Sequence, residues 1–356
     1  MAVLMGLLGI EDRKTTVDQV GQKAVFDAIN QIADRQSAEV DAMIQAFVLD
    51  PAETNYKEVY YLPGGGYMQD ADEKGAQPGA VKSYGQWDVA YDLRDARDAM
   101  GWDDVAAAYM TIEEMDAQME TISMRHINWV RYHLLSHLLL KNNATFNDKK
   151  YGALTIRRLI NADGQPIPPL IGTQSEVTNH QHYFGSNYVA SSISSTNNPF
   201  ITIREHLAEH FDTGTPVVLM NPTHEAIVSA LPGFVPYTPL HVTPGANTAT
   251  LSDTDLANVP GRMIGAINDV AVFTWRRFPA NYLFGWDLDA PKPLKQRVDE
   301  DVAASLRGFK LVAEQTDFPL TKSQWRDRRG FGVANRLNGV AMQLVASTTY
   351  TDPTIV

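Results

Sequence analysis

The stretch that decides the fold runs from Thr111 to Lys141 and reads TIEEMDAQMETISMRHINWVRYHLLSHLLLK. Thr111 and Glu114 have the spacing of a capping box, which marks the start of a helix. Apolar residues then recur at helical spacing, at Ile112, Met115, Met119, Ile122, Trp129, Val130 and Leu134. At 1.5 Å per residue a helix of this length spans about 46 Å, close to the roughly 50 Å diameter of a compact body of this chain length. The sequence therefore predicts one helix that runs nearly the length of the subunit.

Two segments before this helix need a surface that they do not supply themselves. Residues 15–48 carry apolar residues at helical spacing, so we expect a helix with one break, stopped by Pro51. A long hairpin is predicted next, with strands over Lys57–Leu62 and Val81–Tyr91 and a polar tip that begins at Pro63–Gly66. An isolated two-stranded hairpin is only marginally stable in water. Both segments therefore favour contact with another part of the protein or with a neighbouring molecule.

The chain after the long helix mixes short helices and strands without the βαβ rhythm of a doubly wound sheet. We expect helices over 201–211 and 224–231, and strands over 216–220, 264–273, 303–314 and 331–346. No internal repeat is found. These patterns predict the α+β fold class.

Composition and charge exclude several classes of protein. The chain has 356 residues, of which 44% are hydrophobic, and no cysteine, so disulfides, thiolate zinc sites and iron–sulfur clusters are excluded. The net charge of −12 argues against a dedicated nucleic-acid binder. Residues 1–120 hold 23 acidic and 9 basic residues, whereas residues 291–330 hold 9 basic and 6 acidic ones. The basic residues Lys322, Arg326, Arg328 and Arg329 indicate a solvated face or, alternatively, contact with a polyanion or an acidic neighbouring subunit.

The most catalytic-looking string is His206-Leu207-Ala208-Glu209-His210, which matches the H-x-x-E-H pattern of inverted zinc peptidases. Two histidines four residues apart share a helix face and could hold Zn²⁺, with Glu209 as base. A further protein ligand would be needed, and the next glutamates, Glu225 and Glu300, lie one very near and one far along the chain. We therefore interpret this segment as a surface or interface helix.

Other candidate motifs are weaker still. His133 and His137 have the same spacing on the long helix, and helix packing explains them; His180 and His182 lie in a polar segment without a carboxylate between them. The acids Asp88, Asp92, Asp95, Asp98, Asp103 and Asp104 do not match an EF-hand loop and indicate a solvated acidic face. We thus expect no catalytic residue, no cofactor-binding residue and no metal ligand.

The order of the parts resembles the major capsid proteins of tailed bacteriophages, which share the Hong Kong 97-type fold. That family has an N-terminal arm, an extended E-loop hairpin, a P-domain with a long spine helix, and an A-domain at the capsomer centre. The resemblance assigns residues 1–51 to the arm, 52–108 to the E-loop region, 109–150 with 296–356 to the P-domain, and 151–295 to the A-domain.

Three passages in the C-terminal half carry the resemblance further. The passage Pro216–Pro222, followed by a short helix and Leu231–Gly233, is similar to an A-domain strand, Asn-Pro and helix. Gly265–Val272 resembles the next A-domain strand, and Arg328–Ala334 resembles the return to the P-domain sheet. Some members of the family form a covalent Lys–Asn crosslink; Lys74 and Lys82 lie in the predicted hairpin, but we predict no crosslink.

The resemblance implies a structural protein of the virion and not an enzyme. Many copies would form pentamers and hexamers that close into an icosahedral shell around phage double-stranded DNA, with assembly in the host cytoplasm. Implied partners are further copies of the chain, portal, scaffolding and decoration proteins, and DNA contacted non-specifically; no membrane partner is expected. Two alternatives stay open: an encapsulin-like compartment shell, which encloses cargo protein, and a zinc metallopeptidase that uses His206, Glu209 and His210.

Overall fold

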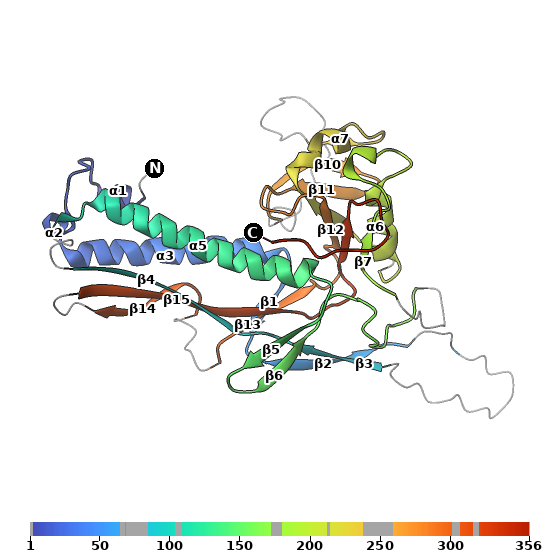
Figure 1. Ribbon diagram of the computed structural model, residues 1–356, viewed down its shortest axis with the longest axis horizontal. Coiled ribbons are helices and arrows are strands. Elements are labelled where there is room, and N and C mark those ends of the chain that lie inside the picture. Colours follow the sequence, from blue (N-terminus) through green and yellow to red (C-terminus); the bar gives the residue numbers. More distant parts are fainter. Residues whose placement is uncertain are drawn as a thin grey trace.

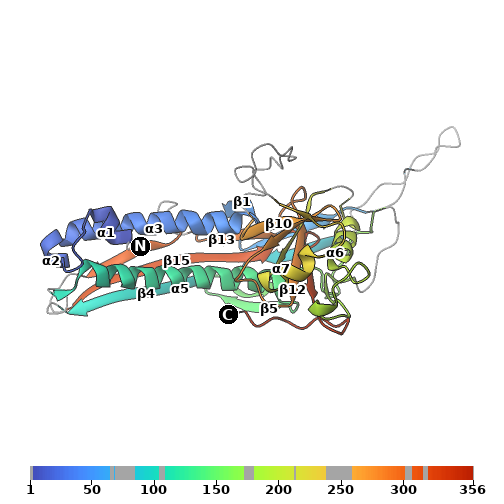
Figure 2. The ribbon, with the colours of Figure 1, turned by 90° about the horizontal axis from the view of Figure 1, so that it is seen from above.

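The computed structural model describes residues 3–64, 68, 85–103, 109–171, 180–211, 214–237, 259–300, 307–315 and 320–355. The molecule has an elongated layer and a second domain that stands at one end of it (Figure 1). The elongated layer consists of two long helices over a narrow sheet, and Figure 2 shows the two helices running side by side along it. Among the described residues, no helix is both long enough and apolar enough to cross a lipid bilayer.

The long helix predicted from the sequence is α5, Ile112–Leu139. Its capping box is formed: the Glu114 amide donates to Thr111 Oγ1 at 3.2 Å, and the Thr111 amide donates to Glu114 Oε2 at 3.0 Å. The predicted N-terminal helix is also found with its break, as α2 (Val17–Val20) and α3 (Gln22–Gln45). A short first helix, α1 (Val3–Leu8), packs against both long helices.

The helices α1, α3 and α5 share one apolar core with the sheet beneath them. The core includes Leu4, Val25, Ile29, Met115, Met119 and Trp325, all buried. The apolar stripe of the N-terminal segment is therefore covered within the same chain, by α1, α5 and the sheet. Of the two coverings that the sequence allowed, another part of the protein is the one found for these residues.

The narrow sheet has five strands, and its longest strand, β15 (Leu320–Val333), holds it together. One edge of β15 pairs with β4 (Arg94–Asp103), and the other edge pairs with β14 (Lys310–Gln315) and then β13 (Leu294–Val298). The edge strand β1 (Val48–Glu53) pairs in parallel with β13. Pro51 lies inside β1, so it does not end the helix, which stops six residues earlier; an edge strand tolerates proline because it has a free side.

The second domain contains a seven-stranded sheet in the order β7-β16-β12-β8-β11-β10-β9. These strands are Tyr183–Gly185, Val340–Gln343, Tyr282–Asp287, Pro216–Met220, Val270–Thr274, Arg262–Ile267 and Val235–Pro236. The helices α6 (Pro199–Ala208) and α7 (Glu225–Ser229) pack on the sheet, and two 3₁₀ turns lie at Ala190–Ser192 and Pro222–His224.

The central strand β8 shows how the two parts are joined. All five of its residues are buried, as expected for a strand covered on both faces. Val217 and Leu219 face a core that also contains residues of α3 and α5, whereas Val218 and Met220 face a core that contains residues of α6. The elongated layer and the second domain therefore share a continuous apolar core.

Two separate hairpins extend from the elongated layer (Figure 1). The first pairs β2 (Lys57–Leu62) with β3 (Gly85–Ala90), from Lys57 opposite Ala90 to Leu62 opposite Gly85. The second pairs β5 (Ala144–Asp148) with β6 (Gly152–Ile156). The pairing of β2 with β3 confirms the predicted hairpin. Its polar tip, with Lys74 and Lys82, lies outside the described residues.

The α+β class is confirmed, but the strand pairing differs from the expected division of the chain at two places. Residues 94–103, placed in the E-loop region, form β4 of the narrow sheet. Residues 340–343, placed in the P-domain, form β16 of the seven-stranded sheet, where their apolar side chains are buried between β12 and β7.

Candidate functional site

The base of the β2–β3 hairpin is fixed by a partly buried polar cluster around Glu58. Its Oε2 accepts hydrogen bonds from Tyr91 OH at 2.6 Å and from Lys295 Nζ at 3.1 Å, and a further one from the Tyr60 hydroxyl. Burial alone would raise the pKa of Glu58, but the bonds from both tyrosines and Lys295 lower it to about 2. Lys295 belongs to β13, so the cluster ties the hairpin to the narrow sheet.

The two faces of strand β2 differ in exposure. Glu58 and Tyr60 point inward, whereas Val59 and Tyr61 point outward and are 45% and 72% exposed. The partner strand β3 contributes Trp87 and Val89 to a buried cluster, and the Trp87 indole N–H donates to the Pro166 carbonyl at 2.7 Å. The hairpin is thus held to its own chain on one face and presents apolar side chains on the other.

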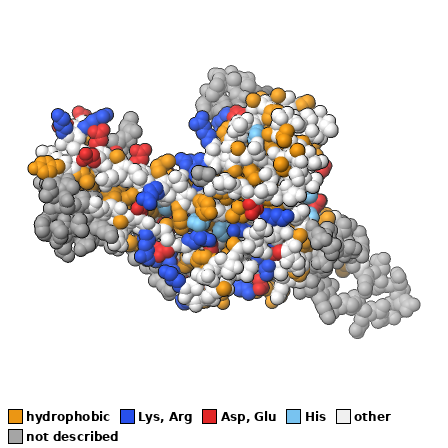
Figure 3. Space-filling model, in the orientation of Figure 1, with side chains coloured by type: hydrophobic (Ala, Val, Ile, Leu, Met, Phe, Trp, Pro, Cys, Tyr) orange, Lys and Arg blue, Asp and Glu red, His pale blue; other side chains and the backbone are white. Residues whose placement is uncertain are grey.

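Further large apolar side chains are exposed at places far from the hairpin. Tyr109, just before α5, is 79% exposed, and Val235 at the edge of the seven-stranded sheet is 65% exposed. Met124 and Tyr132 of α5 are also exposed. The face shown in Figure 3 mixes apolar side chains with charges of both signs. Val59 and Tyr61 are neighbours on one face of a strand, whereas Tyr109 and Val235 are single exposed residues of a kind common on protein surfaces.

The uneven charge of the sequence has an explanation inside the subunit. Strand β4 carries three acids and two arginines, β15 carries four basic residues and one acid, and the two strands pair along ten positions. Arg326 Nε donates to Asp95 at 3.0 Å, and Arg329 Nε donates to Asp327 at 2.6 Å, with its NH1 3.0 Å from Asp41. Arg329 is buried, so the expected solvated basic face is wrong for this residue, and the described bases mostly pair with acids of the same chain.

The acids singled out in the sequence belong to the same network. Asp92 is buried, pairs with Arg94 at 2.6 Å and accepts from the Phe331 amide at 2.9 Å. Burial opposes the ionised form of Asp92, but the nearby charges and these bonds hold its pKa below the usual range. Asp88 pairs with Lys57 and Asp98 with Arg125. The side chain of Asp103 and the whole of Asp104 lie outside the described residues.

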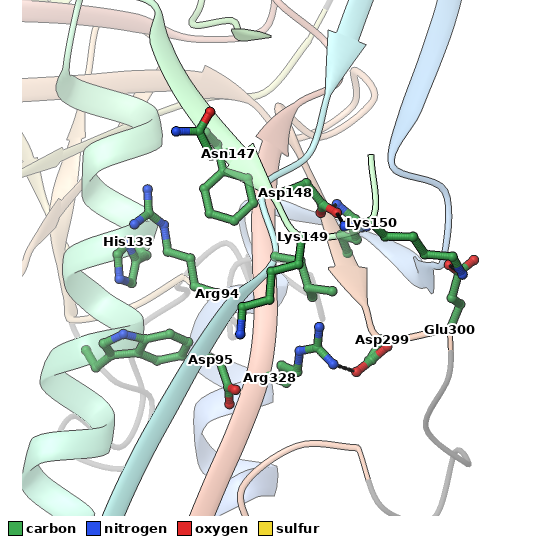
Figure 4. A pocket seen from close by; sticks show the side chains of 14 residues that line it. Arg94, Asp95, His133, Asn147, Asp148, Lys149, Lys150, Asp299, Glu300 and Arg328 are labelled. Atoms are coloured by element: carbon green, nitrogen blue, oxygen red, sulfur yellow. Dashed lines mark hydrogen bonds and ion pairs between the residues drawn. The ribbon is translucent and has the colours of Figure 1, made fainter. Parts of the chain in front are cut away.

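A cavity of about 390 Å³ lies between α5, β4 and the β5–β6 hairpin (Figure 4). Its charged groups pair with each other: Arg297 with Asp148 at 2.9 Å, Arg328 with Asp299, and Lys150 with Glu300. His133 also lines the cavity, and burial lowers its pKa to about 4. The carboxylates named here each have a basic partner, so together they form an ion-pair network.

The histidines considered in the sequence fall into two groups. His133 and His137 are buried on α5, where the packing of the helix explains them, as expected. His206 lies in the last turn of α6, and Glu209 and His210 follow that helix. The structure brings His210 beside His180 and His182, which immediately precede β7, so that the Nε2 atoms of these three rings lie within 3.2 Å of one another.

Comparison with solved structures identifies the fold. A chain from Mycobacterium phage Patience superposes with a TM-score of 0.70 at 20% sequence identity, and the match covers 96% of this chain and 93% of that chain. The chain has a Hong Kong 97-type fold. The structures titled as the cyanophage A-1(L) capsid asymmetric unit and the capsid of the native GTA particle have TM-scores of 0.49 each, at 13% and 10% identity. They cover 86% and 85% of this chain, and the matches span 94% and 90% of those chains.

No protein-family model and no curated protein matches the sequence, so sequence relatives do not identify the fold. The resemblance in the order of the parts is nevertheless confirmed by the Hong Kong 97-type fold. Two features of the site were not predicted from sequence: the Glu58 cluster and the pairing of β4 with β15. A signal for the second was present, since the acidic stretch 88–104 and the basic stretch 322–329 have complementary charge.

Proposed function

We propose that the chain is the major capsid protein of a tailed bacteriophage, a structural protein whose copies form pentamers and hexamers of an icosahedral shell around double-stranded DNA. The observation that carries this proposal is the match of the whole fold to a phage chain, over 96% of the residues. In this reading the β2–β3 hairpin is the E-loop, the elongated layer is the P-domain and the seven-stranded sheet belongs to the A-domain.

The exposed surfaces support a role in assembly. The outward face of β2 carries Val59 and Tyr61, and Tyr109 and Val235 lie exposed at other parts of the molecule. Stable protein interfaces of standard size bury about 1,600 Å² in total, and a shell subunit contacts several neighbours at once. The portal, scaffolding and decoration proteins, non-specific contact with the enclosed DNA, and assembly in the host cytoplasm are part of the same proposal.

The two alternatives differ from it in testable ways. An encapsulin-like shell would have the same fold and enclose protein cargo. A zinc peptidase would need His206 and His210 to bind one metal ion together, but the histidines that converge with His210 are His180 and His182. The geometry therefore does not assemble the metal site that the H-x-x-E-H pattern would require.

Electron microscopy of the purified full-length chain tests the proposal. Negatively stained samples should show capsomers or closed shells of uniform size. Particles recovered from phage-infected cells should contain DNA protected from nuclease. Uniform shells that contain a co-purifying protein and no DNA would favour the compartment alternative, and a protein that forms no ring or shell at any concentration would contradict both readings.

A further inference from the structure

Three histidine rings converge at the edge of the seven-stranded sheet, between the end of α6 and the start of β7; Figure 1 labels both elements. The Nε2 atoms of His180 and His182 are 3.1 Å apart, and each lies 3.2 Å from Nε2 of His210. His182 is completely buried, and the other two rings are partly buried. Four of the nine histidines of the chain fall within residues 180–210.

Hydrogen bonds among the three rings cannot account for this arrangement. Each Nε2 atom either carries a proton or presents a lone pair. Since there are three atoms and two states, at least two of them are in the same state, and that pair repels at 3.1–3.2 Å. A cation placed between three lone pairs removes the conflict, because all three atoms then play the same role.

The hydrogen bond at the far side of His182 fixes its protonation. His182 Nδ1 lies 2.7 Å from the Gly339 carbonyl oxygen. A carbonyl only accepts, so Nδ1 carries the proton and Nε2 presents its lone pair to the other two rings. Histidines that bind metals typically donate their second ring N–H to a backbone carbonyl or a carboxylate in this way, which orients the ring.

The distances and the charge state also suit a metal ion. With Zn–N bonds of 2.0–2.1 Å, the nitrogens of a tetrahedral site are about 3.3 Å apart, near the observed separations. Burial lowers the pKa of His180, lowers that of His182 well below its usual value, and lowers that of His210 to about 3. Neutral imidazole is the form that binds metals.

A carboxylate adds negative charge beside the three rings. Glu209 Oε2 lies 3.4 Å from His180 Nε2, and this buried oxygen has no hydrogen-bond partner among the described residues. His206, by contrast, turns its Nδ1 toward Glu209 at 3.5 Å and packs its ring against Phe184, with ring centroids 4.7 Å apart.

We propose that His180, His182 and His210 bind one divalent transition-metal ion of the Zn²⁺ type. Imidazole ligands suit zinc and its neighbours in the first transition row, whereas calcium and magnesium prefer oxygen. The ion would join the segment before β7 to the end of α6 and so stabilise the edge of the sheet. The proposed site replaces the expectation that the chain has no metal ligand. Only one of its three ligands, His210, belongs to the H-x-x-E-H string.

The binding test uses the untagged full-length chain, stripped with a chelator and then loaded with Zn²⁺ or Co²⁺ alone. After gel filtration, elemental analysis should find one zinc per chain, and the midpoint of thermal unfolding should rise by several degrees. The Co²⁺ form should show the visible absorption of a tetrahedral site. The absence of cysteine removes thiolates as competing ligands. A chain that retains no stoichiometric metal, with an unchanged midpoint, overturns the proposal.

Matched variants locate the site. His180→Asn and His210→Asn should each lose the bound zinc and the rise in melting temperature, while both leave the His182 bond to Gly339 in place. His206→Asn is the control within the motif, and His224→Asn is a control at a buried histidine elsewhere in the same domain; both should retain one zinc per chain. Zinc retained by His180→Asn and lost by His206→Asn would place the metal at the peptidase motif and overturn this assignment.

Discussion

At the scale of single residues, Glu58 anchors the hairpin, because its carboxylate joins β2 to Tyr91 and to Lys295 of β13. Hydrogen bonds to a charged group contribute about 1.5–3 kcal/mol. We expect Glu58→Gln to lower the free energy of unfolding of the dissociated subunit by about that amount at pH 7, as measured by urea denaturation. The matched control is Glu225→Gln, whose partner Arg262 is largely exposed; it should change stability by less than about 0.5 kcal/mol.

Glu58 should also make the free energy of unfolding of the subunit depend on pH. The pKa of Glu58 is about 2 in the folded protein, below its ordinary value of 4.5. A depressed pKa means that the carboxylate stabilises the fold fully above about pH 4.5 and loses this effect as the pH falls toward 2. The difference in stability between the wild type and Glu58→Gln should therefore shrink across that window. A difference that stays constant from pH 7 to pH 2 would show that the charge of Glu58 is not the cause.

Gly330 of β15 lies against Asp92, in the segment between β3 and β4. A Cβ atom at this position would lie 1.8 Å from the backbone oxygen of Asp92, which cannot move independently. We expect Gly330→Ala to destabilise the subunit by about 1–3 kcal/mol. Gly6→Ala is the control, because no atom lies within 4 Å of the added carbon and α1 is a helix; it should be neutral or stabilising. Equal urea midpoints for the two variants would contradict this.

At the scale of elements, the two faces of the hairpin should respond differently to substitution. Val59 and Tyr61 are exposed in the subunit and, in our proposal, contact a neighbour. The double variant Val59→Ser, Tyr61→Ser should change the stability of the dissociated subunit by less than about 0.5 kcal/mol. It should nevertheless lower the yield of particles measured by sedimentation, since the lost contact is repeated in every copy.

Val89 on the inner face is the matched control. This side chain is completely buried, so Val89→Ala should lower subunit stability by roughly 1–3 kcal/mol. Normal particle yield from the Val59 and Tyr61 double variant would show that the outward face of β2 is an ordinary surface. A large loss of subunit stability in that variant would show that the face is covered by its own chain.

The sequence predicted those elements that carry a strong local signal. The capping box at Thr111 and the apolar run of Pro216–Met220 correctly predicted α5 and β8. Strand β4, by contrast, begins with Arg-Asp-Ala twice over, a pattern that favours no strand by itself, and it forms because β15 pairs with its whole length. Such a pairing joins residues more than 200 positions apart, which local periodicity cannot reveal.

The same limit applied to the histidine cluster. Each pair of histidines was visible in the sequence, but only the packing of α6 against the seven-stranded sheet brings His210 to His180 and His182. The density of histidine in residues 180–210 was the available signal. Spacing along one helix instead pointed to His206 as the partner of His210, because a pattern in a single element cannot show which of its residues meets a neighbouring element.

At the scale of the whole molecule, shape and charge together predict how assembly depends on salt. The two long helices and the narrow sheet form an elongated body (Figures 1 and 2). The net charge of the chain is −12, and many of its described basic side chains are paired within the subunit. Copies should therefore repel one another through their net charge and attract through their exposed apolar side chains.

Salt screens the repulsion, since the Debye length falls from about 30 Å at 0.01 M to about 8 Å at 0.15 M, and it leaves apolar contacts largely intact. We expect light scattering at micromolar concentration to show capsomers or shells, and we expect the assembled fraction to rise between these two ionic strengths. Assembly that weakens as salt is added would mean that ion pairs between subunits dominate the interfaces. A monodisperse species of 39.5 kDa at both ionic strengths would contradict the proposed function itself, because a shell protein with these exposed surfaces should not remain a monomer.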